Sequence, residues 1–206
     1  MAFGYPVSLD VAGRKAVVIG AEAIRQGKAA ALAAAGAEVV VRDEREWTPA
    51  DLDGAFVCVA ASSDAATREA IYRAGRERGV LVNVMDDVPH CDFAAPAVVR
   101  RGDLTIAVAT GGRSPALARR LRERLGHQFG PEWADALAVL GEVRDETLPL
   151  LPDLAERAQR WADALDVEEL ARLVREGRRS EAKDRLRSRL LISQPENRER
   201  SEVAAS

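Results

Sequence analysis

Three stretches of the sequence combine residue types that could do chemistry. Asp86 lies just past the mostly apolar run Val80–Val84, and a carboxylate at the end of a buried strand can act as a general acid or base. Gly20 ends a second apolar run and precedes an alanine-rich helix, as in turns that bind the phosphates of a dinucleotide. The third stretch, Thr110–Pro115, places two glycines, an arginine and a serine before a helix, which is typical of an anion site.

Each stretch also has a purely structural interpretation. The aspartate at position 86 and its neighbour could cap a turn, and Ser114 is a good helix N-cap followed by proline at the first helical position. The dinucleotide fingerprint G-x-G-x-x-G would need glycine at positions 20, 22 and 25, but this chain has Gly20, Glu22 and Arg25. Spacing alone therefore leaves both interpretations open.

The elements that must position these residues alternate between strands and helices. Apolar runs at 17–19, 39–41, 55–61 and 80–84 predict buried strands, and helices are expected after Gly20 and over 64–78, the latter with Arg68 on its polar side. Residues 5–10 are expected to form a short edge strand. This pattern predicts an α/β fold with a Rossmann-like, doubly wound parallel sheet that binds ligands at the carboxyl ends of its strands. The expected cofactor-binding residues at that edge are Gly20, Glu22, Ala23, Ile24, Asp43, Glu44, Ala61 and Ser62.

The pattern changes after Asp86. Residues 95–109 predict two strands joined by a turn at Gly102-Asp103, and a helix follows from Pro115. From about Pro131 the chain is expected to be all helical, and its last residues are polar. The predicted organisation is a dinucleotide-binding domain (1–95), a small hairpin-plus-helix segment (96–126), an all-helical C-terminal domain (127–192) and a disordered tail (193–206).

Composition narrows the class of protein. The chain has 206 residues, 31% of them charged, and a formal net charge of −3, which argues against non-specific binding to nucleic acid. No apolar run approaches 20 residues and no signal peptide is recognisable, so a cytoplasmic protein without a membrane span is expected. The run His90-Cys91-Asp92 is not spaced like a metal site, and no resident metal is expected.

The motifs together resemble the precorrin-2 dehydrogenase / sirohydrochlorin ferrochelatase family of sirohaem synthesis, over most of residues 5–192. The most specific pieces are the Asn-Val-x-Asp motif, Asn83–Asp86, and the stretch Leu104–Arg119. The other matching pieces are Pro6–Asp10, Val17–Gly20, Lys28, Ala37–Val41, Asp51–Phe56, Ala60–Asp64, Cys91–Phe93 and Pro96–Ala97.

The resemblance implies a homodimer in which the hairpin-plus-helix segment mediates dimerisation. It implies oxidation of precorrin-2 to sirohydrochlorin with NAD⁺, and some family members then insert Fe²⁺ as a substrate metal to give sirohaem. One family aspartate serves as the acid/base residue in both reactions and falls on Asp86. The tetrapyrrole substrate carries many carboxylates, so the expected substrate-binding residues are Gly111, Gly112, Arg113 and Ser114.

The first turn departs from the family pattern, which has three consecutive glycines where this chain has Gly20, Ala21 and Glu22. A carboxylate there would repel the phosphates unless it points away, and Arg25 could compensate by pairing either with Glu22 or with the phosphate. At the end of the second strand, Asp43 would favour the ribose hydroxyl of NAD, while Arg42 could equally meet the 2′-phosphate of NADP. A chelatase without NAD and a non-catalytic tetrapyrrole-binding relative are the alternatives.

Overall fold

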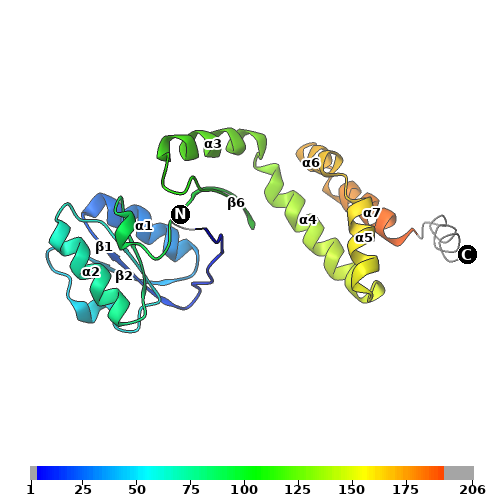
Figure 1. Ribbon diagram of the computed structural model, residues 1–206. Coiled ribbons are helices and arrows are strands. Elements are labelled where there is room, and N and C mark those ends of the chain that lie inside the picture. The colour runs from blue at the N-terminus through cyan, green and yellow to red at the C-terminus, as the bar shows by residue number, and fades with distance from the viewer. Residues whose placement is uncertain (1–3, 193–206) are drawn as a thin grey trace, which may run out of the picture. The chain divides into compact units, whose positions relative to one another are not determined.

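The structure is a computed structural model that describes residues 4–192 (Figure 1). The chain forms two compact units. The first contains the residues up to Ala97 and returns for Ala109–Ala118, while the second contains Val98–Val108 and the chain from Arg119 onward. Among residues 4–192, no helix is both long enough and apolar enough to cross a membrane. The expected tail, 193–206, lies outside the described residues.

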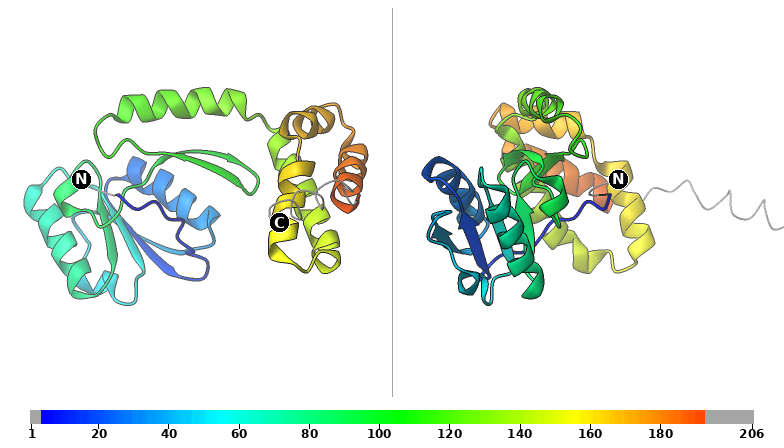
Figure 2. Two further views of the ribbon diagram at one scale, coloured as in Figure 1. Left: turned by 45° about the vertical axis from the view of Figure 1, so that its right-hand side comes forward. Right: turned by 60° about the vertical axis from the view of Figure 1, so that its left-hand side comes forward.

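A four-stranded parallel sheet in the order β2-β1-β3-β4 forms the centre of the first unit. Its strands and helices are β1 (Lys15–Ile19), α1 (Glu22–Ala34), β2 (Glu38–Arg42), β3 (Val57–Ala60), α2 (Ala65–Glu77) and β4 (Leu81–Val84), with the 3₁₀ turns η1 (Pro49–Leu52) and η2 (Val88–His90). Helices α1 and α2 cover opposite faces of the sheet (Figures 1 and 2). This is the predicted doubly wound arrangement.

Burial explains why these short apolar runs form strands. Every residue of β3, and every residue of β1 after Lys15, is buried. A strand covered on both faces reads as a continuous apolar run, which is the pattern of parallel sheets. On the face covered by α2, Ile71 and Ala74 pack with Ile19, Val82 and other strand residues into one core.

The strand register brings the carboxyl ends of the four strands to one level. Ile19 pairs with Arg42 on one side and Ala60 on the other, and Ala60 pairs with Val84. The residues that follow these strand ends therefore gather at a single edge of the sheet. The connection through α1 runs from β1 outward to β2, and the connection through α2 runs in the opposite direction from β3 to β4, which makes the edge between β1 and β3 a topological switch point.

The segment 5–10 does not form the expected edge strand, because none of its residues joins a ladder. Tyr5 and Val7 stay exposed, and Pro6 has no N–H to donate. Beside β4, the edge is instead occupied by the chain at Cys91, which bridges to Asn83 in antiparallel fashion.

The second unit contains the predicted hairpin and a helical domain. Its elements are β5 (Ala97–Arg101), β6 (Leu104–Val108), the continuation of α3 (Pro115–Gln128), α4 (Glu132–Thr147), η3 (Leu148–Leu150), α5 (Leu154–Ala164), α6 (Val167–Arg175) and α7 (Arg179–Leu191). Apolar side chains of α4, α6 and α7, among them Val139, Leu173 and Leu186, form its core.

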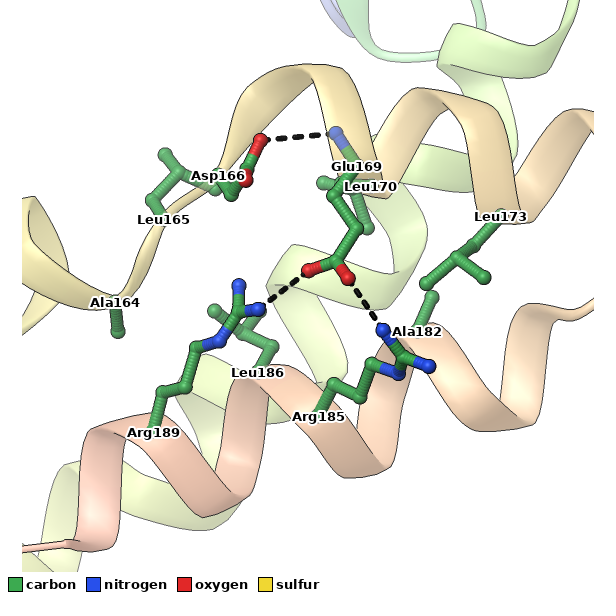
Figure 3. A pocket seen from close by; sticks show the side chains of 10 residues that line it. All are labelled: Ala164, Leu165, Asp166, Glu169, Leu170, Leu173, Ala182, Arg185, Leu186 and Arg189. Atoms are coloured by element: carbon green, nitrogen blue, oxygen red, sulfur yellow. Dashed lines mark hydrogen bonds and ion pairs between the residues drawn. The ribbon is translucent and has the colours of Figure 1, made fainter.

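A salt-bridged recess lies between α6 and α7 (Figure 3). The carboxylate of Glu169 bridges Arg185 and Arg189 across it, 2.7 Å from Nη2 of Arg189. The recess holds only about 10 Å³, which is the volume of roughly one water. It is a structural clamp between two helices and has no room for a ligand.

The close approach of Gly20 to β3 gives a test of the sheet edge. Gly20 has φ 153°, and a Cβ there would lie 3.0 Å from the carbonyl oxygen of Ala61. We expect Gly20→Ala to lower the free energy of unfolding by about 1–3 kcal/mol. Gly27→Ala is the matched control: it lies in α1 with nothing within 4 Å of its Cβ, and should raise stability by about 0.5–1 kcal/mol.

Urea denaturation followed by tryptophan fluorescence checks this prediction. Trp47 packs against the core of the first unit, whereas Trp133 and Trp161 pack in the second. Replacing the latter two by phenylalanine leaves Trp47 as the reporter. Equal stability of the two glycine variants would contradict the proposed contact.

Candidate active site

A groove of about 450 Å³ opens at the carboxyl edge of the parallel sheet. Residues that follow β1, β2, β3 and β4 contribute to its wall, because the strand register brings the carboxyl ends of all four strands to one level. The groove is lined by Ala21, Ile24, Glu44, Ala61, Ser62, Ser63, Arg68, Met85 and Asp86. The structure therefore brings together four of the eight predicted cofactor-binding residues and the predicted acid/base residue.

The N-terminus of α1 faces this edge without a side-chain cap. Its N-cap residue is Ala21, which makes no side-chain hydrogen bond to the first turn. The backbone N–H groups of a first turn carry partial positive charge and attract phosphate. Together with Gly20, which lets the backbone approach β3 closely, this geometry fits a dinucleotide pyrophosphate.

Glu22 is turned along the helix by two hydrogen bonds. Its Oε2 accepts from Nη2 of Arg25 at 2.7 Å, and its Oε1 accepts from Nε2 of Gln26 at 2.9 Å. Arg25 is largely buried and also lies 3.6 Å from the carboxylate of Asp43. The predicted pairing of Arg25 with Glu22 is confirmed. Glu22 stands where the fingerprint has glycine, and the guanidinium of Arg25 balances its negative charge.

Asp86 stands at the rim of the groove in an unusual backbone conformation. Its φ is 60°, and it is the sole non-glycine residue with positive φ among residues 4–192. Such strain in a non-glycine residue persists where the surroundings fix it, and it clusters at functional sites. The side chain of Asp86 is exposed to solvent.

The loop that carries Asp86 is closed by the chain returning along β4. The backbone N–H of Asp92 donates to the carbonyl of Val82 at 2.7 Å, and the side chain of Asp92 accepts from the N–H of Val82 at 2.9 Å. Asn83, in the Asn-Val-x-Asp motif, donates to the carbonyl of Phe93 at 2.7 Å. Cys91 donates its thiol to the carbonyl of Val84 at 3.0 Å. The motif asparagine therefore shapes the loop that presents the aspartate.

Arg68 ties this loop to the end of β3. Its Nε donates to Oδ2 of Asp87 at 2.7 Å, and its Nη1 donates to the carbonyls of Ser62 and Ser63 at 3.1 Å each. The sequence pattern puts Arg68 on the polar side of its helix, and in the structure its side chain is 25% exposed and makes polar contacts with the loops after β3 and β4. Asp64, the N-cap of α2, comes only four residues after the end of β3 at Ala60, so Arg68, one turn later, can reach back over the sheet edge.

His90 and Arg68 both lower the pKa of Asp87. Nδ1 of His90 is 3.0 Å from Oδ2 of Asp87, but the buried Nδ1 makes no aligned hydrogen bond to any described residue. Arg68 meets the same oxygen with good geometry, so we take Arg68 as the firmer partner. By contrast, burial raises the pKa of the Cys58 thiol to about 12, as expected for a core cysteine.

The remaining predicted residues lie near the groove but do not line it. Ala23 and Glu22 belong to the first turn of α1, and Asp43 follows β2. In the glycine stretch, Ser114 caps α3 as expected by accepting from the N–H of Leu117 at 3.2 Å. A Cβ on Gly112 would lie 3.7 Å from Val88, which places this stretch beside the loop after β4. The lining residues absent from the prediction are Ala21, Ser63, Arg68 and Met85.

Comparisons with known proteins show which proteins this chain is similar to. A model described as putative NAD(P)-binding matches residues 7–97, so the first unit contains a domain of that class. A model described as sirohaem biosynthesis protein central matches residues 101–128. The resemblance to the sirohaem-synthesis family is thus confirmed, and the chain is a homologue of part of the siroheme synthases.

Two siroheme synthases are similar in sequence to most of this chain. Siroheme synthase 1 of Pectobacterium atrosepticum is 32% identical over 93% of this chain and 44% of its own length. Siroheme synthase 1 of Yersinia enterocolitica is 31% identical over 97% of this chain and 45% of its own length. The chain therefore spans less than half the length of these relatives. The solved structure of SirC, a precorrin-2 dehydrogenase, has the same fold, with a TM-score of 0.69 and 23% identity over 89% of this chain and 99% of that one.

The Arg68–Asp87 pair predicts a pH-dependent contribution to stability. Because the folded pKa of Asp87 is lowered, its contribution is fully present above the unfolded pKa of about 3.9 and is lost as pH falls through the folded value. At pH 6 we expect Asp87→Asn to lower the free energy of unfolding by about 1–2 kcal/mol.

Urea denaturation at pH 6 and at successively lower pH measures this difference. Asp184→Asn removes an exposed carboxylate of α7 and should change stability by less than about 0.5 kcal/mol at every pH. A wild-type advantage over Asp87→Asn that stayed constant through the acid range would count against the ion pair.

Proposed function

We propose that this chain is an NAD-dependent dehydrogenase that oxidises precorrin-2 to sirohydrochlorin in sirohaem biosynthesis. The observation that carries the proposal is one groove in which the uncapped N-terminus of α1 and the strained Asp86 lie at the same sheet edge. The relatives named siroheme synthase and the fold of SirC support it.

In this proposal the first turn of α1 holds the pyrophosphate of the dinucleotide. Gly20 and Ala21 bring backbone close to it, and Glu22, Ala23 and Ile24 supply N–H groups or flanking surface. Asp43 and Glu44 follow β2, on the side where the adenosine ribose of a dinucleotide lies. Ala61 and Ser62 follow β3 on the opposite side. When bound, NAD⁺ accepts a hydride.

Asp86 is proposed to accept the proton that leaves the substrate as the hydride departs. Its loop is held by Arg68 and by the return of the chain along β4, so the carboxylate is oriented before substrate arrives. Covering of the groove by a large tetrapyrrole would exclude water from this carboxylate and strengthen its basicity.

The tetrapyrrole carboxylates would meet the glycine stretch before α3. Gly111 and Gly112 both have positive φ, and the side chain of Arg113 is exposed and free to form an ion pair with a carboxylate. Ser114 is already occupied as the N-cap of α3, so its proposed role is to fix this turn. Fe²⁺ insertion stays a prediction of the family resemblance, and a chelatase-only protein is the alternative if NAD does not bind.

Replacement of Asp86 by asparagine tests the acid/base role. Asparagine tolerates positive φ, so Asp86→Asn keeps the backbone while removing the proton acceptor. We expect the rate of precorrin-2 oxidation to fall about 10²–10⁴-fold, with NAD⁺ affinity nearly unchanged. Anaerobic turnover followed by absorbance, together with NAD⁺ titration by calorimetry, measures both quantities.

Asp86→Gly serves as a second variant because it relieves the backbone strain completely. It should be as inactive as Asp86→Asn. Wild-type turnover in either variant would overturn the assigned role. Absence of NAD⁺ binding to the wild-type protein at millimolar concentration would remove the dehydrogenase proposal and favour the alternative.

We also propose a homodimer formed through β5, β6 and α3. The hairpin sheet has only two strands in the described part of the chain, and Leu117 on α3 is 50% exposed. The hairpin and this leucine both belong to the segment to which the family resemblance assigns dimerisation, and their free strand edges and exposed side chain support the proposal.

Leu117→Glu should convert the dimer to a monomer. Light scattering coupled to size exclusion should give about twice 22.3 kDa for the wild-type protein and 22.3 kDa for the variant. Leu154→Glu is the matched control, because Leu154 is 71% exposed in the helical domain and lies outside the dimerisation segment. A wild-type monomer, or an equal effect of the two variants, would contradict this surface.

A further inference from the structure

Arg42 occupies the position beside the first turn where NAD and NADP are distinguished. It is the last residue of β2, and its carbonyl accepts a hydrogen bond from the N–H of Gly20 at 3.1 Å. In dinucleotide folds the end of this strand meets the adenosine ribose, where a carboxylate binds the 2′-hydroxyl and an arginine binds the 2′-phosphate. Both residue types are present here, as Arg42 and Asp43.

The guanidinium of Arg42 is already engaged by the protein. Its Nε donates to Oδ1 of Asp51 at 2.6 Å, and its Nη1 donates to the carbonyl of Val41 at 2.9 Å. These bonds fold the side chain toward η1 and along the exposed edge of β2, which is the outer strand of the sheet.

Asp51 is itself fixed by the turn that it belongs to. Its Oδ2 accepts from the N–H of Thr48 at 2.7 Å and from the Thr48 hydroxyl at 3.2 Å, as the capping box of η1. Its side chain is only 13% exposed. Burial by itself would raise the pKa of Asp51, but the hydrogen bonds from Thr48 and Arg42 lower that pKa overall. Oδ1 is thus held ionised and aimed at Arg42.

Asp43 has a different environment. Its Oδ1 accepts from the N–H of Arg45 at 3.0 Å, and Oδ2 lies 3.6 Å from Arg25, a loose contact that leaves the oxygen able to accept a further hydrogen bond. At the end of β2, Arg42 is therefore held by hydrogen bonds within the protein, while Asp43 keeps an oxygen that can accept a hydrogen bond from a ligand.

We propose that Asp51 is a specificity-determining residue: by holding Arg42 it withholds that guanidinium from a 2′-phosphate and leaves Asp43 to bind the ribose hydroxyl of NAD. The inference rests on the proposed function, because it assumes that a dinucleotide binds at this edge. Recruiting Arg42 to NADP would leave the nearly buried carboxylate of Asp51 without its cationic partner, which is costly.

Calorimetric titration with NAD⁺ and NADP⁺ tests the inference directly. The wild-type protein should bind NAD⁺ at least about tenfold more tightly than NADP⁺. Asp51→Asn keeps the acceptor for Thr48 but loses the charge that holds Arg42. It should tighten NADP⁺ binding by about tenfold, or about 1.4 kcal/mol, and change NAD⁺ affinity by less than about twofold.

Asp53→Asn is the matched control. It removes one negative charge two residues further along, where Asp53 pairs with Arg78 instead of Arg42. The ratio of the two affinities should stay at the wild-type value. A gain in NADP⁺ binding equal to that of Asp51→Asn would show a general charge effect and overturn the proposal.

Two further variants keep the test independent of how Asp51→Asn folds. Asp51→Asn combined with Arg42→Gln should lose the gain in NADP⁺ affinity. Arg42→Gln alone should leave NADP⁺ binding at its weak wild-type level, and several-fold weakening would mean that Arg42 already contacts the 2′-phosphate, which overturns the proposal. Binding of neither dinucleotide to the wild-type protein overturns the proposed function as well, whereas NAD⁺ binding with an unchanged ratio in Asp51→Asn overturns this inference alone.

Discussion

The level register of four parallel strands is the constraint on which the rest of the structure depends. Because Ile19 pairs with Arg42 and Ala60, and Ala60 pairs with Val84, every strand releases its chain at one edge. The apolar runs impose this arrangement, since strands buried on both faces are stable only between two helical layers. A one-residue slip would move each side chain of the slipped strand to the other face of the sheet and would shift the turn at Gly20 relative to the loop that carries Asp86.

Three arginines at this edge are each paired with a carboxylate. Arg25 meets Glu22, Arg42 meets Asp51, and a third arginine joins the ends of β3 and β4. An anionic cofactor can approach a surface rich in carboxylates because these guanidinium groups lie among them. The same arginines order the loops, so one set of contacts serves both geometry and electrostatics.

Much of this architecture could be predicted from the sequence because local patterns determine it. Apolar β-branched runs marked the strands, Gly102-Asp103 marked the hairpin and Ser114 marked a helix start, and the structure contains all three. The sequence did not predict that Arg68 lines the groove. Helical periodicity shows which side of α2 faces the sheet, but it does not show that the first turn of α2 lies over the edge of the sheet. The pairing of Arg42 with Asp51 depends on a tertiary turn that no short pattern encodes.

The discontinuous first unit has a consequence for how the chain folds. Its last piece, Ala109–Ala118, is separated from Ala97 by the hairpin that belongs to the second unit. During synthesis from the N-terminus, the parallel sheet can therefore pair early, but the unit stays unfinished until the chain beyond Ala118 has emerged. A fragment cut where the NAD(P)-binding match ends, at residue 97, would keep every strand of the sheet and lack the glycine stretch beside it.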